Sequence, residues 1–124
     1  MVDLNLWLKE AKVAPNADKC GMYLTHNGVV RSTAKAQVRD GISSAPVTGM
    51  NFSYNAEKVA LAKEQALAMP GIYYVRIELE EGELSVGDDI MYLLIGGDTR
   101  PHTLDAFNFL MDEIKSKCVK EIEL

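Results

Sequence analysis

Three well-separated cationic side chains stand at the ends of predicted secondary-structure elements, where a side chain can reach a ligand. Arg31 ends a strand-like segment, Arg100 opens a predicted helix, and Lys115 closes that helix. Arginine suits phosphate because its guanidinium makes paired hydrogen bonds and never loses its charge. Lysine can stabilise developing negative charge or, once desolvated, act as a base or nucleophile. These residue types would suit chemistry between anionic molecules.

The same residues also have an ordinary interpretation, which residue types alone leave open. Arg31 would then be a solvated cation, and Lys115, three residues after Asp112, would form an ion pair on the helix surface. Arg100 has support of its own, because a cation beside the first turn of a helix joins free backbone N–H groups in forming an anion site. Lys117 faces roughly the opposite side of the helix from Lys115 and is expected at the surface.

Capping residues, apolar spacing and β-branched residues predict the elements that would position these cations. Asp3 and Asn55 are suited to cap helices, Pro70-Gly71 ends the second helix, and Asp98 or Thr99 is suited to cap the third. The expected helices cover residues 4–12, 56–69 and 100–115, and the expected strands cover residues 20–31, 47–54, 72–79 and 88–95, with residues 120–124 as a candidate strand. Residues 32–46 are expected to form a long polar loop, and Gly96-Gly97 is expected to end the fourth strand.

This order of elements predicts an α+β fold, with a mixed or antiparallel sheet packed with helices in a single domain over residues 1–124. The composition, 48% hydrophobic and 25% charged, is sufficient for one core. The last helix would contribute a core stripe made of Leu104, Phe107, Leu110, Met111, Ile114 and Cys118.

Charge and hydropathy exclude several classes of function. The net charge of -5 argues against a nucleic-acid surface, which needs clustered cations. No apolar run is long enough to span a membrane, and the acidic N-terminal segment is unlike a signal peptide, so a cytosolic location is expected. Cys20 and Cys118 are far apart and lack metal-ligand spacing, and we expect both to be inert, partly buried thiols.

Two blocks of the sequence together resemble the large, catalytic subunit of molybdopterin synthase, the MoaE-like family. The later block, residues 82–115, has the pattern G-E-L-x-x-G-D, an apolar strand, an arginine at the next helix start and a helix that ends L-M-D-x-I-K. The earlier block follows the pattern G-x-x-x-T-x-x-G-x-V-R, here Gly21, Thr25, Gly28, Val30 and Arg31. The resemblance covers about residues 21–115 and depends on the order and spacing of these blocks.

The resemblance implies a fold of the alpha/beta-hammerhead type and a part in molybdenum cofactor biosynthesis. The implied reaction transfers sulfur from a thiocarboxylate, on the C-terminal Gly-Gly tail of a small ubiquitin-like, MoaD-like subunit, to a cyclic pterin phosphate precursor. The resemblance also implies a homodimer and no cofactor, whether metal or nucleotide.

By position in the matching motifs, Arg31 and Arg100 resemble the family's anion-holding arginines, and Lys115 resembles its catalytic lysine. We expect these three side chains to share one pocket. Lys120 is the nearest candidate for a second functional lysine, which the family has in a W-K-x-E context, although the tryptophan is absent here.

Other departures from the family pattern affect the expected pocket. The family often has a histidine just before the helix-start arginine, whereas Thr99 stands there and His102 lies two residues beyond Arg100; both are candidate substrate-binding residues. Leu79-Glu80 replaces a His-Arg pair that the family has before the G-E-L turn. His26, in the earlier block, is expected to be structural or exposed. The alternative hypothesis is therefore a catalytically impaired relative that acts as a binding or regulatory subunit.

Overall fold

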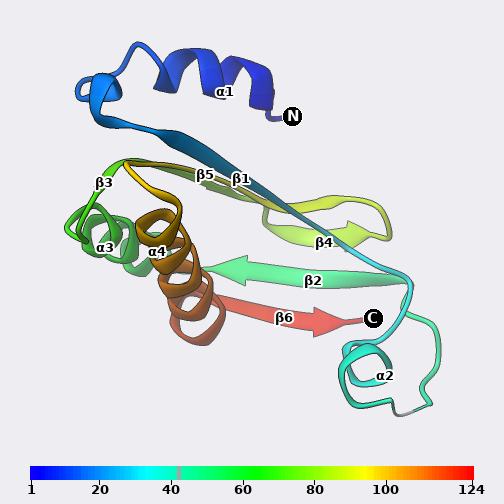
Figure 1. The fold of residues 1–124 in the computed structure, drawn as a ribbon. Helices are drawn as coiled ribbons and strands as arrows, with labels where there is room; N and C mark the ends of the chain where they lie inside the picture. The colour runs from blue at the N-terminus through cyan, green and yellow to red at the C-terminus, as the bar shows by residue number, and fades with distance from the viewer. Residues whose placement is uncertain (42) are drawn as a thin grey trace.

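The computed structural model describes residues 1–41 and 43–124, in which six strands form two antiparallel sheets (Figure 1). The first sheet has the order β1 (Met22–Val29), β5 (Asp89–Gly97) and β3 (Ile72–Leu79), and the second has the order β4 (Gly82–Ser85), β2 (Gly49–Tyr54) and β6 (Val119–Glu123). Each of the four strand pairs is antiparallel. The predicted α+β class is confirmed, with two antiparallel sheets in place of one.

Helices cover both faces of the first sheet. The described helices are α1 (Leu4–Ala11), α2 (Lys35–Asp40), α3 (Ala56–Leu67) and α4 (Arg100–Glu113), with a 3₁₀ turn η1 (Ala17–Lys19) and a π-helical turn η2 (Ile114–Cys118). α1 lies over one face, whereas α3, α4 and the second sheet lie on the other side, and α2 stands apart near the end of β6 (Figure 1). No described helix has the length and apolar character needed to cross a membrane.

The central strand, β5, supplies side chains to two separate cores. Leu93 and Ile95 pack toward α3 and α4, while Tyr92 and Leu94 pack toward α1. A strand covered on both faces needs apolar side chains at consecutive positions, which accounts for the apolar run in this part of the sequence. Trp7 completes the core under α1 with an edge-on contact to Tyr92, at 6.3 Å between ring centroids.

The predicted helix starts are confirmed by the hydrogen bonds that cap them. The Asp3 carboxylate accepts from the backbone N–H groups of Asn5 and Leu6 at 3.0 and 3.2 Å. The Asn55 side-chain oxygen accepts from the N–H of Lys58 at 3.1 Å. Each bond satisfies an N–H that the helix itself leaves without a partner, so α1 and α3 begin where the sequence predicts.

The prediction that Gly96-Gly97 ends the strand is wrong, because β5 continues through both glycines. Both positions lie where other atoms approach the backbone closely. A Cβ on Gly96 would lie 2.8 Å from the Tyr23 ring, and a Cβ on Gly97 would lie 2.1 Å from the Thr103 hydroxyl oxygen. The glycines therefore serve close packing of β1 and α4 on β5, and they do not mark a break.

The prediction of a loop over residues 32–46 is wrong for residues 35–40, which form α2. The Glu123 carboxylate accepts from the N–H of Lys35 at 3.0 and 3.2 Å, so a residue far along the chain caps this helix. Local sequence patterns cannot predict a contact between residues so far apart in the chain. Ile42, in the same predicted loop, lies outside the described residues.

Two further features differ from the sequence predictions. A short strand that was not predicted, β4, forms because its backbone pairs with β2. Leu104 is 39% exposed, whereas Thr103 and Ala106 are fully buried against the sheet. The helix therefore turns Leu104 away from the core, while the predicted core positions Leu110, Ile114 and Cys118 are buried.

Candidate active site

A cavity of about 450 Å³ is lined by residues of β1, α2, β2, β5, α4, η2 and β6. We call it the cationic pocket, because the charged and titratable side chains that line it are Arg31, Lys35, Arg39, Lys115, His26, Glu121 and Glu123. Apolar side chains of the core, among them Phe52 and Ile114, line the rest of it. A concave site with an apolar base and a few convergent charges suits a small anionic molecule.

Two of the predicted site residues, Arg31 and Lys115, come together in this pocket. Arg31 follows the end of β1, and its Nε donates to the Thr33 carbonyl at 3.1 Å. This bond leaves the outer nitrogens of the guanidinium without a hydrogen bond to any described residue. The paired donors that recognise a phosphate or carboxylate therefore remain available.

Lys115 lies in the π-helical turn that continues α4, where its ammonium donates to Glu121 of β6 at 2.9 Å. The ordinary interpretation, in which Lys115 pairs with Asp112 on the helix surface, is therefore wrong about the partner, because Lys115 contacts the last strand instead. The Glu121 side chain is only 19% exposed, so the carboxylate holds the ammonium at the pocket wall. Lys117 pairs with Glu113 and is exposed, which confirms the prediction that it lies at the surface.

Lys35 and Arg39 line the pocket from α2, although the sequence interpretation assigned them no function. They are four residues apart, so a helix places them on one face. That spacing would have identified them if the helix had been predicted. Because Glu123 holds the start of α2, the last strand also fixes the wall that carries these two cations.

Arg100 lies at the other end of α4 and does not line the cationic pocket. From the rise of an α-helix, it is about 20 Å along the helix axis from Lys115. Within one chain, therefore, the structure brings Arg31 and Lys115 together and leaves Arg100 apart.

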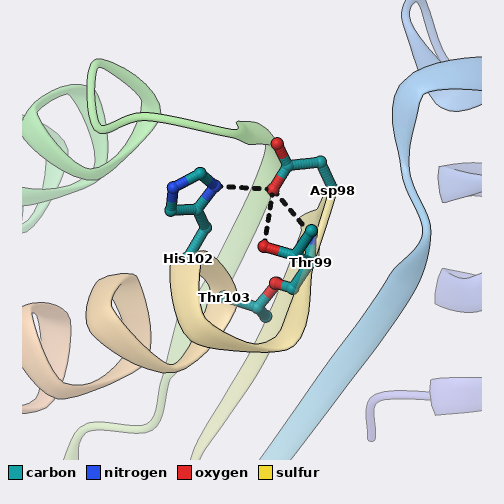
Figure 2. A network of polar contacts seen from close by, with 4 residues as sticks. All are labelled: Asp98, Thr99, His102 and Thr103. Atoms are coloured by element: carbon teal, nitrogen blue, oxygen red, sulfur yellow. Dashed lines mark hydrogen bonds and ion pairs between the residues drawn. The ribbon is translucent and has the colours of Figure 1, made fainter.

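Thr99 and His102 lie beside Arg100 and form a small polar network around Asp98 (Figure 2). One Asp98 carboxylate oxygen accepts from the Thr99 N–H at 2.6 Å and contacts His102 Nδ1 at 2.8 Å. The hydrogen bond to His102, together with those from Thr99, lowers the pKa of Asp98. Thr99 begins the helix without a side-chain cap bond of its own, while the Thr103 hydroxyl donates to its carbonyl at 2.8 Å.

Lys120 lies on β6 between Val119 and Glu121, two of the three residues of this strand that line the pocket. Side chains alternate along a strand, so Lys120 points to the opposite face, and it is exposed. It does not line the pocket.

His26 is the titratable pocket residue that the sequence interpretation treated as structural or exposed. It lies on β1 between exposed Thr25 and Asn27, and the face of the strand that it occupies is turned toward α4. Burial, and then the nearby Lys115 ammonium, lower the pKa of His26. Alternation along the strand was the available signal, because it separates His26 from its polar neighbours.

Comparisons with known proteins agree with this architecture. A family model described as MoaE protein matches residues 2–117. The structure of molybdopterin synthase from Staphylococcus aureus has a TM-score of 0.75 and 14% identity, over 99% of this chain and 85% of that chain. A molybdopterin biosynthesis MoaE protein from Burkholderia ambifaria has a TM-score of 0.72 and 19% identity, over 97% and 77% of the two chains.

A third similar structure is a protein-protein complex of subunits 1 and 2 of molybdopterin-converting factor from Helicobacter pylori. Its TM-score is 0.68 with 15% identity, over 99% of this chain and 79% of that chain. A search of curated proteins finds no match.

The two antiparallel sheets, the helices on both faces and the pocket at the end of α4 define an α+β protein with the fold of molybdopterin synthase large subunits. The family model covers nearly the whole sequence. The chain belongs to the MoaE family. The predicted family is therefore confirmed, and with it a role in molybdenum cofactor biosynthesis.

Proposed function

We propose that this chain transfers sulfur from the thiocarboxylated C-terminal tail of a small MoaD-like subunit to a cyclic pterin phosphate precursor, forming molybdopterin. The observation that supports this proposal is the convergence of four cations around one cavity in a chain whose net charge is -5. Both reactants are anions, so the pocket must offset their mutual repulsion. Four cations against two carboxylates give it a local excess of positive charge.

The proposed division of labour follows the position of each cation. Arg31, Lys35 and Arg39 lie at the end of β1 and on α2, and they hold the phosphate of the precursor. Lys115, in the turn after α4, stabilises the negative charge that develops as the thiocarboxylate reacts. The outward position of Lys120 gives no support for a second catalytic lysine. The cytosolic location stays a prediction.

We also propose that the active form is a homodimer. Arg100 cannot reach the pocket of its own chain, so any part it takes in anion binding there requires the pocket of a second copy. Thr99 and His102 would accompany it, since the Asp98 network ties them to the same helix start.

The test is to mix the purified protein with thiocarboxylated small subunit and precursor and to measure the dithiolene product. Lys115→Ala should abolish turnover while the fold, followed by circular dichroism, is retained. Lys117→Ala is the matched control, because this exposed lysine lies in the same turn and pairs outside the pocket. Full activity of Lys115→Ala would refute the catalytic assignment.

A second candidate function is a noncatalytic relative that binds the small subunit without turnover. The observation that favours it is the presence of Glu121 and Glu123 in the pocket, with Glu121 occupying the Lys115 ammonium. Intact binding of the thiocarboxylated subunit with no product from the wild-type protein would select this candidate.

A further inference from the structure

His26 has no part in the proposal above, although its side chain is placed in the same pocket as Lys115. Its imidazole contacts the Phe107 ring edge-on, at 5.5 Å between centroids and 61° between planes. Phe107 lies on α4 on the helix face that also carries Met111, four residues further on, and Met111 lines the pocket. The His26 ring is therefore held at the pocket wall by its contact with Phe107, and this contact does not occupy the imidazole nitrogens.

The nitrogens of His26 remain accessible from the cavity. No hydrogen bond joins the imidazole to another residue in the described parts of the chain, and among those residues no buried side-chain nitrogen or oxygen lacks a partner. The nitrogens must therefore reach open space. The charged groups that line the pocket around them are Lys115 from η2, Arg31 after β1, Lys35 and Arg39 from α2, and Glu121 and Glu123 from β6, while β2, β5 and α4 contribute only apolar side chains to its lining.

The environment favours the neutral imidazole. Burial and the Lys115 ammonium both lower the pKa of His26, because each disfavours a second positive charge at this place. A neutral imidazole with a free nitrogen can accept a proton near pH 7.

We infer that His26 is the proton acceptor for a water molecule that releases the acyl group during sulfur transfer, an inference that rests on the proposed function. In the proposed transfer, the thiocarboxylate sulfur forms a bond to a carbon of the precursor while a carbon–oxygen bond at that carbon breaks and its electron pair leaves on the oxygen. The small subunit is then joined to the pterin as a thioester. The water oxygen then forms a bond to the acyl carbon while its proton passes to His26. The carbon–sulfur bond breaks, and its electron pair stays on sulfur as a thiolate. The remaining proton leaves the new carboxylic acid for solvent.

The experiment is a single-turnover reaction followed by mass spectrometry of the small subunit, with wild type, His26→Phe and His26→Gln. His26→Phe preserves an aromatic contact with Phe107, and His26→Gln covers the case in which that variant does not fold. The control is Thr25→Val, an exposed neighbour on the other face of β1. We expect both His26 variants to slow product release by about 100-fold or more, the usual effect of a general base, and to accumulate a hydroxylamine-sensitive thioester adduct.

The outcomes separate this inference from the function on which it rests. A wild-type rate in His26→Phe would show that His26 serves packing alone and would overturn the inference while leaving sulfur transfer in place. A slow variant without the adduct would place the defect before acyl release and would overturn it as well. Wild-type protein that binds both reactants and yields neither adduct nor product would overturn the proposed function and this inference together.

Discussion

The Lys115 ammonium donates to the Glu121 carboxylate at 2.9 Å and so joins the turn after the last helix to the final strand. The carboxylate is the more buried partner, with 19% of its side chain exposed against 41% for the lysine. Glu121 therefore sets where the cation lies, and it also reduces the net charge available to an anionic ligand. This pairing makes the Glu121 carboxylate a determinant of how strongly the pocket binds anions.

Glu121→Gln should tighten the binding of inorganic phosphate to the pocket. Removing the carboxylate frees the Lys115 charge, and because a partly exposed ion pair is worth about 0.2–1 kcal/mol, the affinity should rise by up to about fivefold. Isothermal titration calorimetry at low and high salt measures the effect, which should shrink as salt screens the charges. Glu113→Gln is the control, since Glu113 pairs with Lys117 outside the pocket. Equal affinities for Glu121→Gln and wild type would contradict this interpretation.

Arg39→Ala should raise the KM for the precursor with a smaller effect on kcat. The guanidinium lies on α2 at the pocket, where it contributes to binding before and during the reaction alike. The loss of one charged hydrogen-bonding partner corresponds to about 1.5–3 kcal/mol, or roughly a 10- to 100-fold increase in KM. Gln37→Ala is the matched control, because Gln37 is exposed on the same short helix and does not line the pocket. A similar KM in both variants would remove Arg39 from the site.

Complementation between two inactive chains tests whether Arg100 acts across a dimer. A mixed dimer of Lys115→Ala and Arg100→Ala chains keeps one complete pocket if Arg100 is supplied by the other copy, and none if it acts within its own chain. Roughly half of the wild-type activity is expected from co-expressed, differently tagged chains purified as the mixed dimer. Activity no higher than that of the single variants would exclude the shared site.

Gly97→Ala should destabilise the fold severely. A Cβ at this position would lie 2.1 Å from the Thr103 hydroxyl oxygen and 3.2 Å from its Cβ, where α4 packs on β5. We expect a loss of about 3 kcal/mol or more, in the range of overpacked cores. Urea denaturation measures it, and Thr103→Gly in the same chain should recover part of the loss by opening the space. Equal stability of wild type and Gly97→Ala would mean that α4 can shift without cost.

His26 should make folding stability sensitive to mild acid. Its pKa is lower in the folded protein than in the unfolded chain, so the unfolded chain takes up the proton more readily. Stability is therefore fully present above the ordinary histidine pKa, about 6.5, and declines as the pH falls from there through the lower folded value. Thermal unfolding of wild type and His26→Phe across this range should show a Tm decrease that the variant lacks. Parallel curves would show that the imidazole stays solvated.

Local patterns predicted most of the fold because they record contacts between near neighbours. Asp3 and Asn55 cap the helices that follow them, and residues 72–79 form the predicted strand. The helix α2 was missed because its capping group, Glu123, is 88 positions away in the sequence. The glycines of β5 were misinterpreted for a similar reason, since the need for them is visible only once β1 and α4 pack on the strand.

The sequence predicted those pocket residues that a motif identifies one position at a time. Arg31 and Lys115 were identified by motif position and do share the pocket. Lys35 and Arg39 depended on the unpredicted helix, and His26 depended on knowing which face of β1 is turned to α4. Arg100 was misplaced within its own chain for a different reason. A helix start can attract anions wherever it lies in a fold, so this feature carries no information about its distance from Lys115.

The bond between Glu123 and the start of α2 links the order of the pocket to the integrity of the final strand. β6 holds Lys115 through one carboxylate and the α2 cations through another, two residues apart on the same face. If β6 frayed, the Lys115 side and the α2 side of the cationic pocket would both lose their positions, while the buried layers around β5 stayed folded. Anion affinity in this protein should therefore be lost well before the global unfolding transition.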